Sequence, residues 1–436
     1  MSYGISDLAF HLPGPSVELD EFIRHRTGEG ADQARLERAL AYTGQQRIRV
    51  PDWYEDSVTM LSEATRRLLE RNPRVSPGDI RHYLSGTESP QDLAKPQAAW
   101  AQGLVSVRGQ RIGPAAATYE VKHACAGGTY ALLGVLNALR AEDSLGLPSL
   151  GVVGMTDIAS YLEGSTAELT RGAGAVALLL EKDPTMLEVE SGLVGVWGEN
   201  VDDFYRSLGR RHATVRGRYS VDCYMRSLEG AYGDFKQRAL QCGAYRRPPG
   251  GHFLDNFDYV VLHAPFHSMP MTALEDLFVR VRGMAPDEAR AEMSRLRIRE
   301  SVASIRQTGN LYTGSLYLCL GDLLVEEQRR VGAALEGRRL LLCSYGSGNT
   351  MVVFGARVVP GAGAVIRKLG IDKAVRGDAR PVTAADASML MALDRDDPAA
   401  YSGLIETRGN EIPTGAYFLK MIRGDGYREY GERTGP

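Results

Sequence analysis

The chain has 436 residues, of which 44% are hydrophobic and 24% charged, and its formal net charge is −3. This composition is typical of a folded globular protein, and the length allows one large duplicated α/β unit or two or three average domains. The small net charge and the lack of long basic runs argue against nucleic acid or an anionic membrane as the main partner. The sequence shows no signal-peptide pattern and no uninterrupted apolar stretch of about 18 residues, so we expect no membrane span.

Elements of an interior α/β sheet follow one another through the first half of the chain. Strands are expected at residues 2–10, 82–89, 115–124, 149–155 and 173–181, the second of them ending in a polar loop. Helices are expected at 53–72, where apolar side chains fall on one stripe, and at 127–143. The uninterrupted apolar runs at 149–155 and 173–181 are typical of strands that are covered on both faces.

The second half repeats this order of strand, polar loop and helix. A strand at 258–266 ends in a polar loop, a loop leads into a helix over 309–328, and residues 339–359 predict a strand, a Gly-rich turn and a second strand. Matching halves favour a duplicated α/β architecture over a single doubly wound sheet. We place the halves at 1–185 and 186–436, with an insertion at about 196–250 that is rich in Tyr and Arg.

The segment VKHACAGGTYALLGVLNAL at 121–139 places Cys125 between an expected strand and an expected helix. A helix N-terminus aimed at the sulfur would stabilise a thiolate, and the two glycines behind it would allow a sharp turn and a close approach of substrate. Backbone N–H groups at this turn could hold an oxyanion. A second interpretation stays open at this point, because cysteine is also common as a buried apolar residue.

The remaining cysteines do not form a recognisable metal or disulfide pattern. They stand at positions 223, 242, 319 and 343, widely spaced and without a CxxC pair or a His/Cys cluster. We therefore expect no zinc site, no disulfide framework and a location in the reducing cytoplasm. Cys223, Cys319 and Cys343 lie in apolar segments typical of a core, whereas Cys242 is expected to be exposed.

Eight segments, in the same order along the chain, carry a resemblance to a known family. They are LSGTES at 84–89, KHACAGGTYAL at 122–132, DDFYR at 202–206, GRYSVDCYMRSLEGAY at 217–232, DYVVLHAPFHSMP at 258–270, GNLYTGSLYLCLGDLL at 309–324, CSYGSGNTMVVFGARV at 343–358 and GAYFLKMIRGDGYREY at 415–430. Together they resemble the 3-hydroxy-3-methylglutaryl-CoA synthase family of the thiolase superfamily. The resemblance implies the duplicated five-layer αβαβα thiolase-like fold and a homodimer.

The resemblance also implies a condensation in which Cys125 carries an acetyl group as a thioester. Glu88 would remove a proton from the acetyl methyl group, and the carbanion would attack the ketone carbon of a β-ketoacyl thioester. His263 and Asn310 would hold this acceptor and stabilise its alkoxide. Further substrate contacts would come from Ala126, Gly127, Tyr205, His267, Tyr312, Ser344, Gly346 and Ser347. The implied substrates are acetyl-CoA or phosphopantetheine-linked acyl groups, with no metal and no other cofactor.

Each candidate also has a plainer interpretation when it is taken alone. Glu88 in its SGTES loop could be a solvated turn residue or a helix cap, and His263 at a strand end could be a hydrogen-bonded structural histidine. Asn310 could merely shape a turn. His123 should point away from Cys125 if the segment is extended, so it is not expected to act as the base. His267 is kept as a residue that lines the pocket.

Two positions depart from the family pattern. Ala126 stands where the family usually has a tyrosine, which predicts an altered acyl pocket. Ser268 stands where the family commonly has a lysine that helps to hold the phosphates of CoA. Because an acyl-carrier protein lacks the 3′-phosphate of CoA, this second departure favours a carrier-protein substrate, as in enzymes that install β-branches on polyketides. Arginines at 206, 210 and 211 would then meet the acidic helix of the carrier.

The favoured hypothesis is an aldol-type condensing enzyme that adds a Cys-bound acetyl unit to a β-ketoacyl thioester, working on carrier-protein substrates. A CoA-dependent enzyme of the mevalonate route is the first alternative. The second is an acyltransferase like ketoacyl-ACP synthase III, and the third is a catalytically silent scaffold. Glu88 within its complete loop argues against the second, and the joint presence of Cys125, His263 and Asn310 with Glu88 argues against the third.

Overall fold

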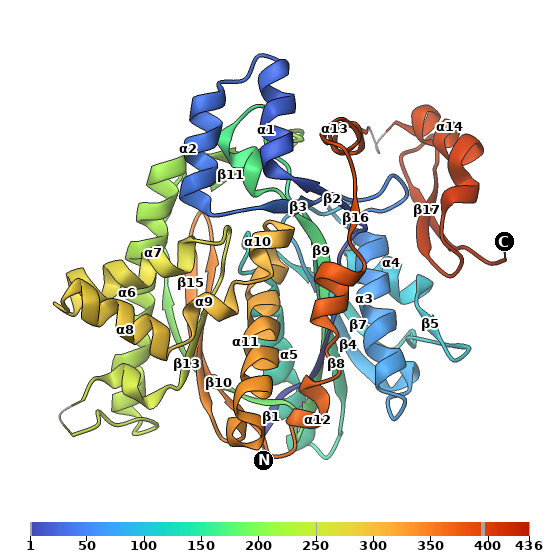
Figure 1. Ribbon diagram of the computed structural model, residues 1–436. Coiled ribbons are helices and arrows are strands. Elements are labelled where there is room, and N and C mark those ends of the chain that lie inside the picture. The colour runs from blue at the N-terminus through green and yellow to red at the C-terminus, as the bar shows by residue number, and fades with distance from the viewer. Residues whose placement is uncertain (1, 250, 394–396, 436) are drawn as a thin grey trace.

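The computed structural model describes residues 2–249, 251–393 and 397–435, and its centre is a nine-stranded sheet. Figure 1 shows this sheet running through the middle of the molecule, with helices on its faces. The strand order is β13-β14-β15-β10-β1-β9-β8-β4-β7. These strands are β1 (Tyr3–His11), β4 (Ile80–Gly86), β7 (Ala117–Val121), β8 (Leu150–Ile158), β9 (Ala173–Lys182), β10 (Leu187–Trp197), β13 (Tyr259–Leu262), β14 (Arg339–Gly346) and β15 (Thr350–Val358).

The sheet consists of two halves with the same topology. The order β1-β9-β8-β4 in the first half corresponds to β10-β15-β14-β13 in the second. In each half the first two pairings are antiparallel and the third is parallel. The halves meet where β1 pairs with β10, with Gly4 opposite Glu188. This correspondence confirms the duplicated α/β architecture expected from the sequence.

Helices complete five layers around the two halves of the sheet. Helices α5 (Gly127–Ser144) and α11 (Ser315–Val331) lie between the halves, α3 (Ser57–Arg71) covers the outer face of the first half, and α6 (Gly217–Gln241) covers that of the second. The αβαβα order is that of the thiolase-like fold. The largest core cluster joins α5 and α11 to strands of both halves, which explains why the apolar runs in these elements are almost continuous.

Local sequence accounts for the main elements. In β9 the side chains from Ala173 to Glu181 are all buried, as the apolar run predicted. Helix α3 begins with a capping box, in which the Asp56 carboxylate accepts from the backbone N–H of Thr59 while the Thr59 hydroxyl accepts from the backbone N–H of Asp56. The expected helix at 53–72 therefore starts at Ser57, because Asp56 is its N-cap.

Several smaller elements surround this frame. Near the N-terminal half they are β2 (Pro15–Glu18), α1 (Leu19–Gly28), α2 (Gln33–Thr43), β3 (Arg47–Arg49), α4 (Gln97–Leu104), β5 (Ser106–Val107) and β6 (Gln110–Arg111). Further along lie β11 (Phe204–Tyr205), β12 (Thr214–Val215), α7 (Met269–Asp276), α8 (Pro286–Arg295), α9 (Ile298–Ser301), α10 (Ile305–Thr308) and α12 (Gly363–Ile366). The last are β16 (Arg380–Pro381), α13 (Ala384–Ala392), α14 (Pro398–Arg408), β17 (Tyr417–Ile422) and β18 (Arg428–Glu432).

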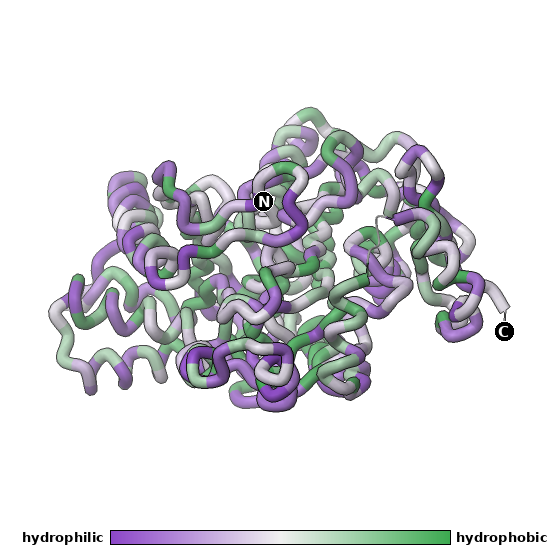
Figure 2. Tube along the Cα trace, turned by 90° about the horizontal axis from the view of Figure 1, so that it is seen from above, coloured by the Kyte–Doolittle hydropathy of each residue, from purple (hydrophilic) through white to green (hydrophobic). Residues whose placement is uncertain are grey.

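The join between the halves is the short connection from Lys182, the end of β9, to Leu187, the start of β10. We propose the division at 185/186 on this ground. Within the expected insertion, α6 occupies the place that α3 has in the first half, so the part that departs from the repeat is 198–216, which contains the β11–β12 hairpin. Seen from above, hydrophilic segments dominate the periphery and hydrophobic ones the interior (Figure 2). Among the described residues, no helix is both long and apolar enough to cross a membrane.

Candidate active site

The duplication brings the four predicted catalytic residues to one place. Glu88 follows β4 and His263 follows β13, which are corresponding strands of the two halves. Cys125 precedes α5 and Asn310 precedes α11, which are the two central helices. The carboxyl ends of the paired strands and the N-terminal ends of the helices between them therefore meet at one side of the sheet.

Cys125 sits on a tight turn between β7 and α5. Ala124, the residue before it, has a φ of 41°, a left-handed conformation that costs a non-glycine residue free energy. The turn is closed by the backbone N–H of Ala126, which donates to the carbonyl of His123 at 3.0 Å, and by that of Gly127, which donates to Ala124 at 3.2 Å. Helix α5 then begins at Gly127 with Ala126 as its N-cap, so its N-terminus lies directly behind the sulfur.

The two glycines after Cys125 are required by the packing of α5 on its neighbours. A Cβ atom on Gly127 would lie 2.5 Å from the carbonyl oxygen of Val121, and one on Gly128 would lie 2.4 Å from the side chain of Met155. A Cβ on Gly86, at the end of β4, would lie 2.4 Å from the backbone of Gly128. Helix α5 can therefore approach β4 and β7 closely only because these positions lack a side chain.

The thiol of Cys125 faces the carboxyl group of Glu88. Its Sγ donates to Glu88 Oε1 at 3.7 Å; Cys125 is buried and Glu88 is half-buried. Burial and then the charge of Asp157 raise the pKa of Glu88 well above its usual range, while the charge of Arg206 lowers it. Burial and then the charge of Glu88 raise the pKa of the Cys125 thiol. Burial therefore favours the protonated thiol in the resting site, while the N-terminus of α5 favours a thiolate.

Asp157, at the end of β8, positions the Glu88 loop and was not singled out from the sequence. Its buried carboxylate accepts four hydrogen bonds from residues 87–89, including one from the backbone N–H of Glu88 at 2.9 Å. It accepts two more from the backbone and hydroxyl of Thr313, at 3.1 and 2.6 Å. Asp157 therefore ties the Glu88 loop to the start of α11. A single Asp at a strand end carries no sequence signal for this role.

The backbone of His263 is fixed by hydrogen bonds, and the residue lines the thiol cavity. Its N–H donates to the carbonyl of Cys343 at 2.8 Å, and its carbonyl accepts from the hydroxyl of Tyr224 at 2.8 Å. Burial lowers the pKa of His263 to about 3, so the ring is neutral at ordinary pH. Its Nδ1 has no hydrogen-bond partner among the described residues. A neutral imidazole in this position can donate one hydrogen bond to a substrate oxygen.

Asn310 has its side-chain oxygen satisfied by the protein. Oδ1 accepts from the backbone N–H of Tyr312 at 2.8 Å and from the hydroxyl of Ser315 at 2.9 Å. These two donors fix the amide orientation and leave the two N–H groups of Nδ2 without a partner among the described residues. Asn310 can therefore donate hydrogen bonds into the cavity that it lines.

A largely apolar cavity of about 870 Å³, which we name the thiol cavity, connects these groups to the surface. Cys125, His263 and Asn310 line it together. Its lining extends to Arg35 of α2 and Arg218 at the start of α6, two exposed cations beside the acidic Asp222. A tunnel of this kind can hold an acyl chain on a slender arm, with the anionic end of the carrier near the arginines.

The predicted substrate contacts fall into two groups. Tyr312 and Ser347 line the thiol cavity, and Tyr205 lines a second cavity described below. The other predicted contacts do not line either cavity. Ala126 packs against Gly346, and Gly127 packs against Val121. Ser344 accepts a hydrogen bond from Thr129 of α5 at 2.8 Å, and the His267 ring contacts the carbonyl of Val302 at 3.2 Å. Because Ala126 is fully buried, its small side chain does not widen either cavity.

The turn after β14 is held by Asp203, which belongs to the DDFYR segment and to which the sequence assigned no individual role. Its carboxylate accepts from the backbone N–H of Gly348 at 2.8 Å and from the hydroxyl of Tyr345 at 2.8 Å. The N–H of Gly348 is therefore already occupied. Of the Ser344–Gly348 turn, Ser347 is the residue that lines both cavities.

Ser268, at the expected lysine position, has a structural partner. Its hydroxyl donates to the carbonyl of Tyr42 at 2.6 Å, and its backbone N–H donates to Thr43 at 3.0 Å. The residue thus holds the C-terminal end of α2, which also carries Arg35. The charge that a lysine would bring is supplied at the cavity mouth by Arg35 and Arg218.

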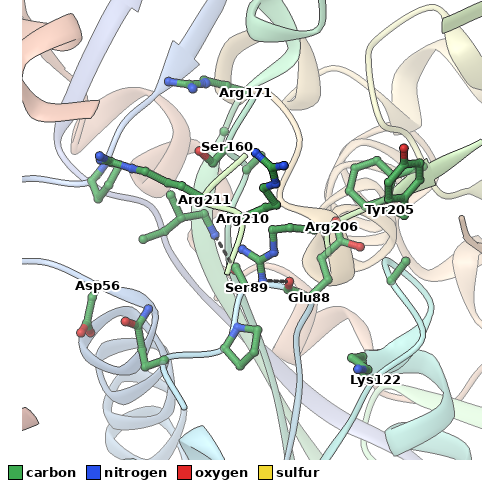
Figure 3. A pocket seen from close by; sticks show the side chains of 18 of the residues that line it. Asp56, Glu88, Ser89, Lys122, Ser160, Arg171, Tyr205, Arg206, Arg210 and Arg211 are labelled. Carbon is green, nitrogen blue, oxygen red and sulfur yellow. Dashed lines mark hydrogen bonds between the residues drawn. The ribbon is translucent and has the colours of Figure 1, made fainter. Parts of the chain in front are cut away.

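A second cavity, of about 1030 Å³, opens on the other side of Glu88, and we name it the arginine cavity. Figure 3 shows it from close by, with Arg206, Arg210 and Arg211 projecting from the loop between β11 and β12. Arg206 donates to the backbone carbonyl of Glu88 at 2.6 Å. These arginines, expected to meet a carrier protein, therefore gather beside the base and not at the mouth of the thiol cavity.

The remaining candidates lie where their sequence context indicated. Cys223, Cys319 and Cys343 are buried and Cys242 is exposed, and all are free thiols. His123 lines the arginine cavity whereas Cys125 lines the thiol cavity, which confirms that the two side chains face different ways. Across the described residues, no three His, Cys, Asp or Glu side chains gather closely enough to hold a metal ion.

Comparison with known proteins identifies relatives of this arrangement. Residues 187–281 and 287–433 match the family described as hydroxymethylglutaryl-coenzyme A synthase C terminal. The hydroxymethylglutaryl-CoA synthase of Enterococcus faecalis is 29% identical over 365 residues, which cover 83% of this chain and 84% of that enzyme.

Solved structures extend the similarity to the whole chain. MvaS in complex with 3-hydroxy-3-methylglutaryl coenzyme A is 32% identical, with a TM-score of 0.83 and coverage of 99% of both chains. The HMG synthase of the curacin biosynthetic pathway, solved with its holo donor-ACP, has a TM-score of 0.79 and 24% identity and covers 99% of this chain and 100% of that one. The similarity to the curacin-pathway enzyme shows that the two proteins share a fold.

Proposed function

Because the chain belongs to the hydroxymethylglutaryl-CoA synthase family of carbon–carbon bond-forming enzymes, we propose that Cys125 is its acyl-carrying nucleophile and Glu88 its base. The observation that carries this assignment is the 3.7 Å contact between Sγ and Oε1 inside a buried site. An acyl group on this sulfur would hold its α-carbon within reach of the carboxylate. The same contact argues against an acyltransferase like ketoacyl-ACP synthase III, which needs no such base.

The first half-reaction is acyl transfer to the thiol. The Cys125 sulfur attacks the carbonyl of an acetyl thioester, the carbon–sulfur bond to the carrier breaks, and the departing thiol takes up the proton that Cys125 loses. The N-terminus of α5 lies behind the sulfur and favours the negative charge that the sulfur carries once its proton has left and before it attacks. The product is acetyl-Cys125 in a site from which water is largely excluded.

The second half-reaction forms the carbon–carbon bond. Glu88 takes a proton from the acetyl methyl group, and its raised pKa makes it a stronger base than an exposed glutamate. The resulting carbanion attacks the β-carbonyl carbon of the acceptor, whose oxygen would accept hydrogen bonds from neutral His263 and from Nδ2 of Asn310. The proton held by Glu88 neutralises the alkoxide, and water then cleaves the acyl–Cys125 bond.

Both acyl groups would arrive on phosphopantetheine through the thiol cavity, and we propose that a carrier protein presents at least the acceptor. Ser268 is committed to α2 and offers no charge for a CoA phosphate. The CoA-dependent alternative is favoured by a different observation, because Arg35 and Arg218 at the same mouth could hold a phosphate. Either source presents the acceptor as a thioester of phosphopantetheine.

We propose further that the enzyme is a cytoplasmic homodimer without a metal cofactor. Strand β7 lies at the edge of the sheet, and Tyr119 within it is 46% exposed, so its unpaired backbone is open to pairing with a second copy. The five free thiols fit a reducing compartment. The proposed chemistry needs only the side chains named above.

The assignment of the nucleophile is tested by mass spectrometry. Incubation with acetyl-CoA is expected to add about 42 Da, the mass of an acetyl group in place of a hydrogen, and peptide mapping should place it on Cys125. A Cys125→Ala protein should gain no such mass. Labelling of Cys223 or Cys343, or an adduct that survives in Cys125→Ala, would contradict the assignment.

A further inference from the structure

The arginine cavity adjoins the reacting groups, and the condensation proposed above does not use it. Glu88 lines the arginine cavity and Cys125 lines the thiol cavity, and their side chains are 3.7 Å apart. Phe204 and Ser347 line both cavities. A chain that enters along the thiol cavity and reacts at Cys125 can therefore continue past Glu88 into the arginine cavity.

The size of this cavity exceeds what the smallest acceptor requires. An acetoacetyl group carries a single methyl group beyond its β-carbonyl. The arginine cavity has a volume of about 1030 Å³, which is as large as sites that enclose whole small-molecule ligands. Apolar side chains, among them Ile158, Phe204 and Leu208, form part of its wall. The cavity thus offers both volume and aliphatic contact to a longer acyl chain.

The charge of the cavity is positive and largely uncompensated. Lys122, Arg206 and Arg210 form no ion pair with a carboxylate among the described residues, and the Arg210 guanidinium makes no hydrogen bond there. Arg171 is 4% exposed and pairs with Glu168 at 3.8 Å, while its Nε has no partner in the described part of the chain. In the view of Figure 3 the guanidinium groups of Arg171, Arg210 and Arg206 follow one another toward Glu88.

Such a set of cations favours an anion at the far end of the cavity. Partly enclosed guanidinium groups bind carboxylates through paired, charge-assisted hydrogen bonds. Of the two acidic residues that line the cavity, Glu88 is the base itself and Asp56 pairs with Arg428 at 3.3 Å. The Arg210 side chain therefore has no carboxylate of the described protein to neutralise it, and Arg206 has only the neighbouring Glu88.

We propose that the arginine cavity binds the part of the acceptor beyond its β-carbonyl and selects β-ketoacyl thioesters that end in a carboxylate. This inference rests on the condensation proposed above and names the acceptor class for the same site. The bonds formed and broken are unchanged, because the distal carboxylate only positions the chain. Arg210 is then a specificity-determining residue.

The experiment compares acceptors that differ only at the distal carbon. The enzyme is first acetylated with acetyl-CoA, and kcat/KM for condensation is measured by mass spectrometry with 3-oxoadipoyl-pantetheine and with 3-oxohexanoyl-pantetheine, which has a methyl group where the other has a carboxylate. A second pair, 3-oxosuberoyl- and 3-oxooctanoyl-pantetheine, extends the chain. For at least one pair the carboxylate acceptor should be favoured about three- to tenfold, the scale of a charge-assisted contact with an exposed guanidinium group.

Arg210 variants test where this preference arises. Arg210→Gln should bring the ratio of the two kcat/KM values toward one, whereas Arg210→Lys, which keeps the charge, should retain most of it. Arg216→Gln is the matched control, because Arg216 follows β12 on the same hairpin, pairs with Asp202 at 2.6 Å and lines neither cavity. Its ratio should equal that of the unmodified enzyme.

The outcomes separate this inference from the function on which it rests. Condensation of acetoacetyl-pantetheine with a ratio near one in both pairs would overturn the inference and leave the proposed function standing. A clear preference for carboxylates that persists in Arg210→Gln would also overturn the assignment to this cavity. Failure to condense even acetoacetyl-pantetheine, despite acetylation of Cys125, would refute the condensation and the inference together.

Discussion

At the scale of single residues, Glu88 and Cys125 share a buried space in which two negative charges would repel each other. Burial raises the pKa of both groups, and the charge of Glu88 raises the pKa of the Cys125 thiol further, whereas the hydrogen bond from Cys125 lowers the pKa of Glu88. Acetylation of Cys125 removes the thiol that donates a hydrogen bond to Glu88. In the acetylated protein the proposed role of the Glu88 carboxylate is to accept the proton of the acetyl methyl group. The two half-reactions therefore make different demands on Glu88.

Replacing Glu88 with Gln should separate these half-reactions. Acetylation of Cys125 should persist, because removing the carboxylate removes a charge that raises the pKa of the thiol. Condensation should fall by about 10²–10⁴-fold, since the amide cannot accept the methyl proton. The measurement is the acetyl adduct by mass and the condensation rate from the preformed acetyl-enzyme. Condensation at close to the normal rate in Glu88→Gln would refute its role as base.

The pH dependence of condensation should report the ionisation of Glu88. The carboxylate must be ionised to act, and its pKa is raised, so the rate should fall with decreasing pH at values above the ordinary glutamate range of about 4.3. His263, with a pKa of about 3, stays neutral over this range and does not contribute. The measurement is the single-turnover rate of acetyl-enzyme against pH.

Replacing Arg206 tests whether Glu88 is the group whose ionisation sets the pH dependence of condensation. Its charge lowers the pKa of Glu88, so Arg206→Gln should raise that pKa and move the acidic limb of the rate profile to higher pH. Arg216→Gln removes the same charge from the same hairpin and should leave the limb in place. A limb that stays fixed in Arg206→Gln, or that moves to lower pH, would mean that Glu88 is not the group that titrates.

At the scale of elements, the start of α5 is shaped by the neighbouring strands. Gly127→Ala would place a methyl group 2.5 Å from the Val121 carbonyl, which belongs to backbone and cannot swing aside. We expect a loss of about 1–3 kcal/mol in the free energy of unfolding, measured by urea denaturation. Gly134→Ala in the same helix is the control, since its Cβ would approach only the Tyr119 hydroxyl at 3.9 Å. It should stabilise the protein by about 0.5–1 kcal/mol. Equal effects of the two changes would contradict this account.

The elements that could be predicted from the sequence are those in which most side chains are buried. The apolar runs of β8 and β9 and the helices that begin near Cys125 and Asn310 are visible because most of their buried side chains are apolar. The segment 15–49, with β2, α1, α2 and β3, was not predicted, because its helices are short and mostly polar. Their stability comes from packing on the rest of the protein, which local sequence does not encode.

The candidate site was predictable where a motif carries the chemistry. Glu88 and His263 each follow a strand with a distinctive polar loop, whereas Asp157 is one acidic residue in an ordinary strand, and its importance lies in six hydrogen bonds from distant segments. Sequence also cannot tell on which side of a hairpin its charges lie. For that reason Arg206 and Arg210 were expected at the carrier surface and are found beside Glu88.

At the scale of the whole molecule, the two cavities separate the entry of substrate from the end of the acyl chain. The mouth of the thiol cavity is framed by α2 and the start of α6, with Arg35 and Arg218 exposed there. Helix α12 lies at the opposite end of the molecule (Figure 1). A carrier that delivers its thioester through this mouth must therefore contact α2, and electrostatic complementarity would arise between these arginines and an acidic surface.

The carrier preference gives a prediction at this scale. Acetoacetyl thioesters of an acyl-carrier protein, of CoA and of pantetheine place the same acyl group in the cavity. They differ only in the part of the carrier that stays outside it. Arg35→Glu should lower kcat/KM for the carrier-linked acceptor about tenfold at low ionic strength, relative to the pantetheine-linked acceptor in the same protein, because a repulsive charge then faces the acidic carrier. Arg367→Glu, which makes the same change beside α12, should leave this ratio unaltered. If CoA were the physiological carrier, the unmodified enzyme would use acetoacetyl-CoA at least as well as the carrier-linked acceptor. In that case Arg35→Glu would reduce turnover of acetoacetyl-CoA, since Arg35 would then serve its phosphates.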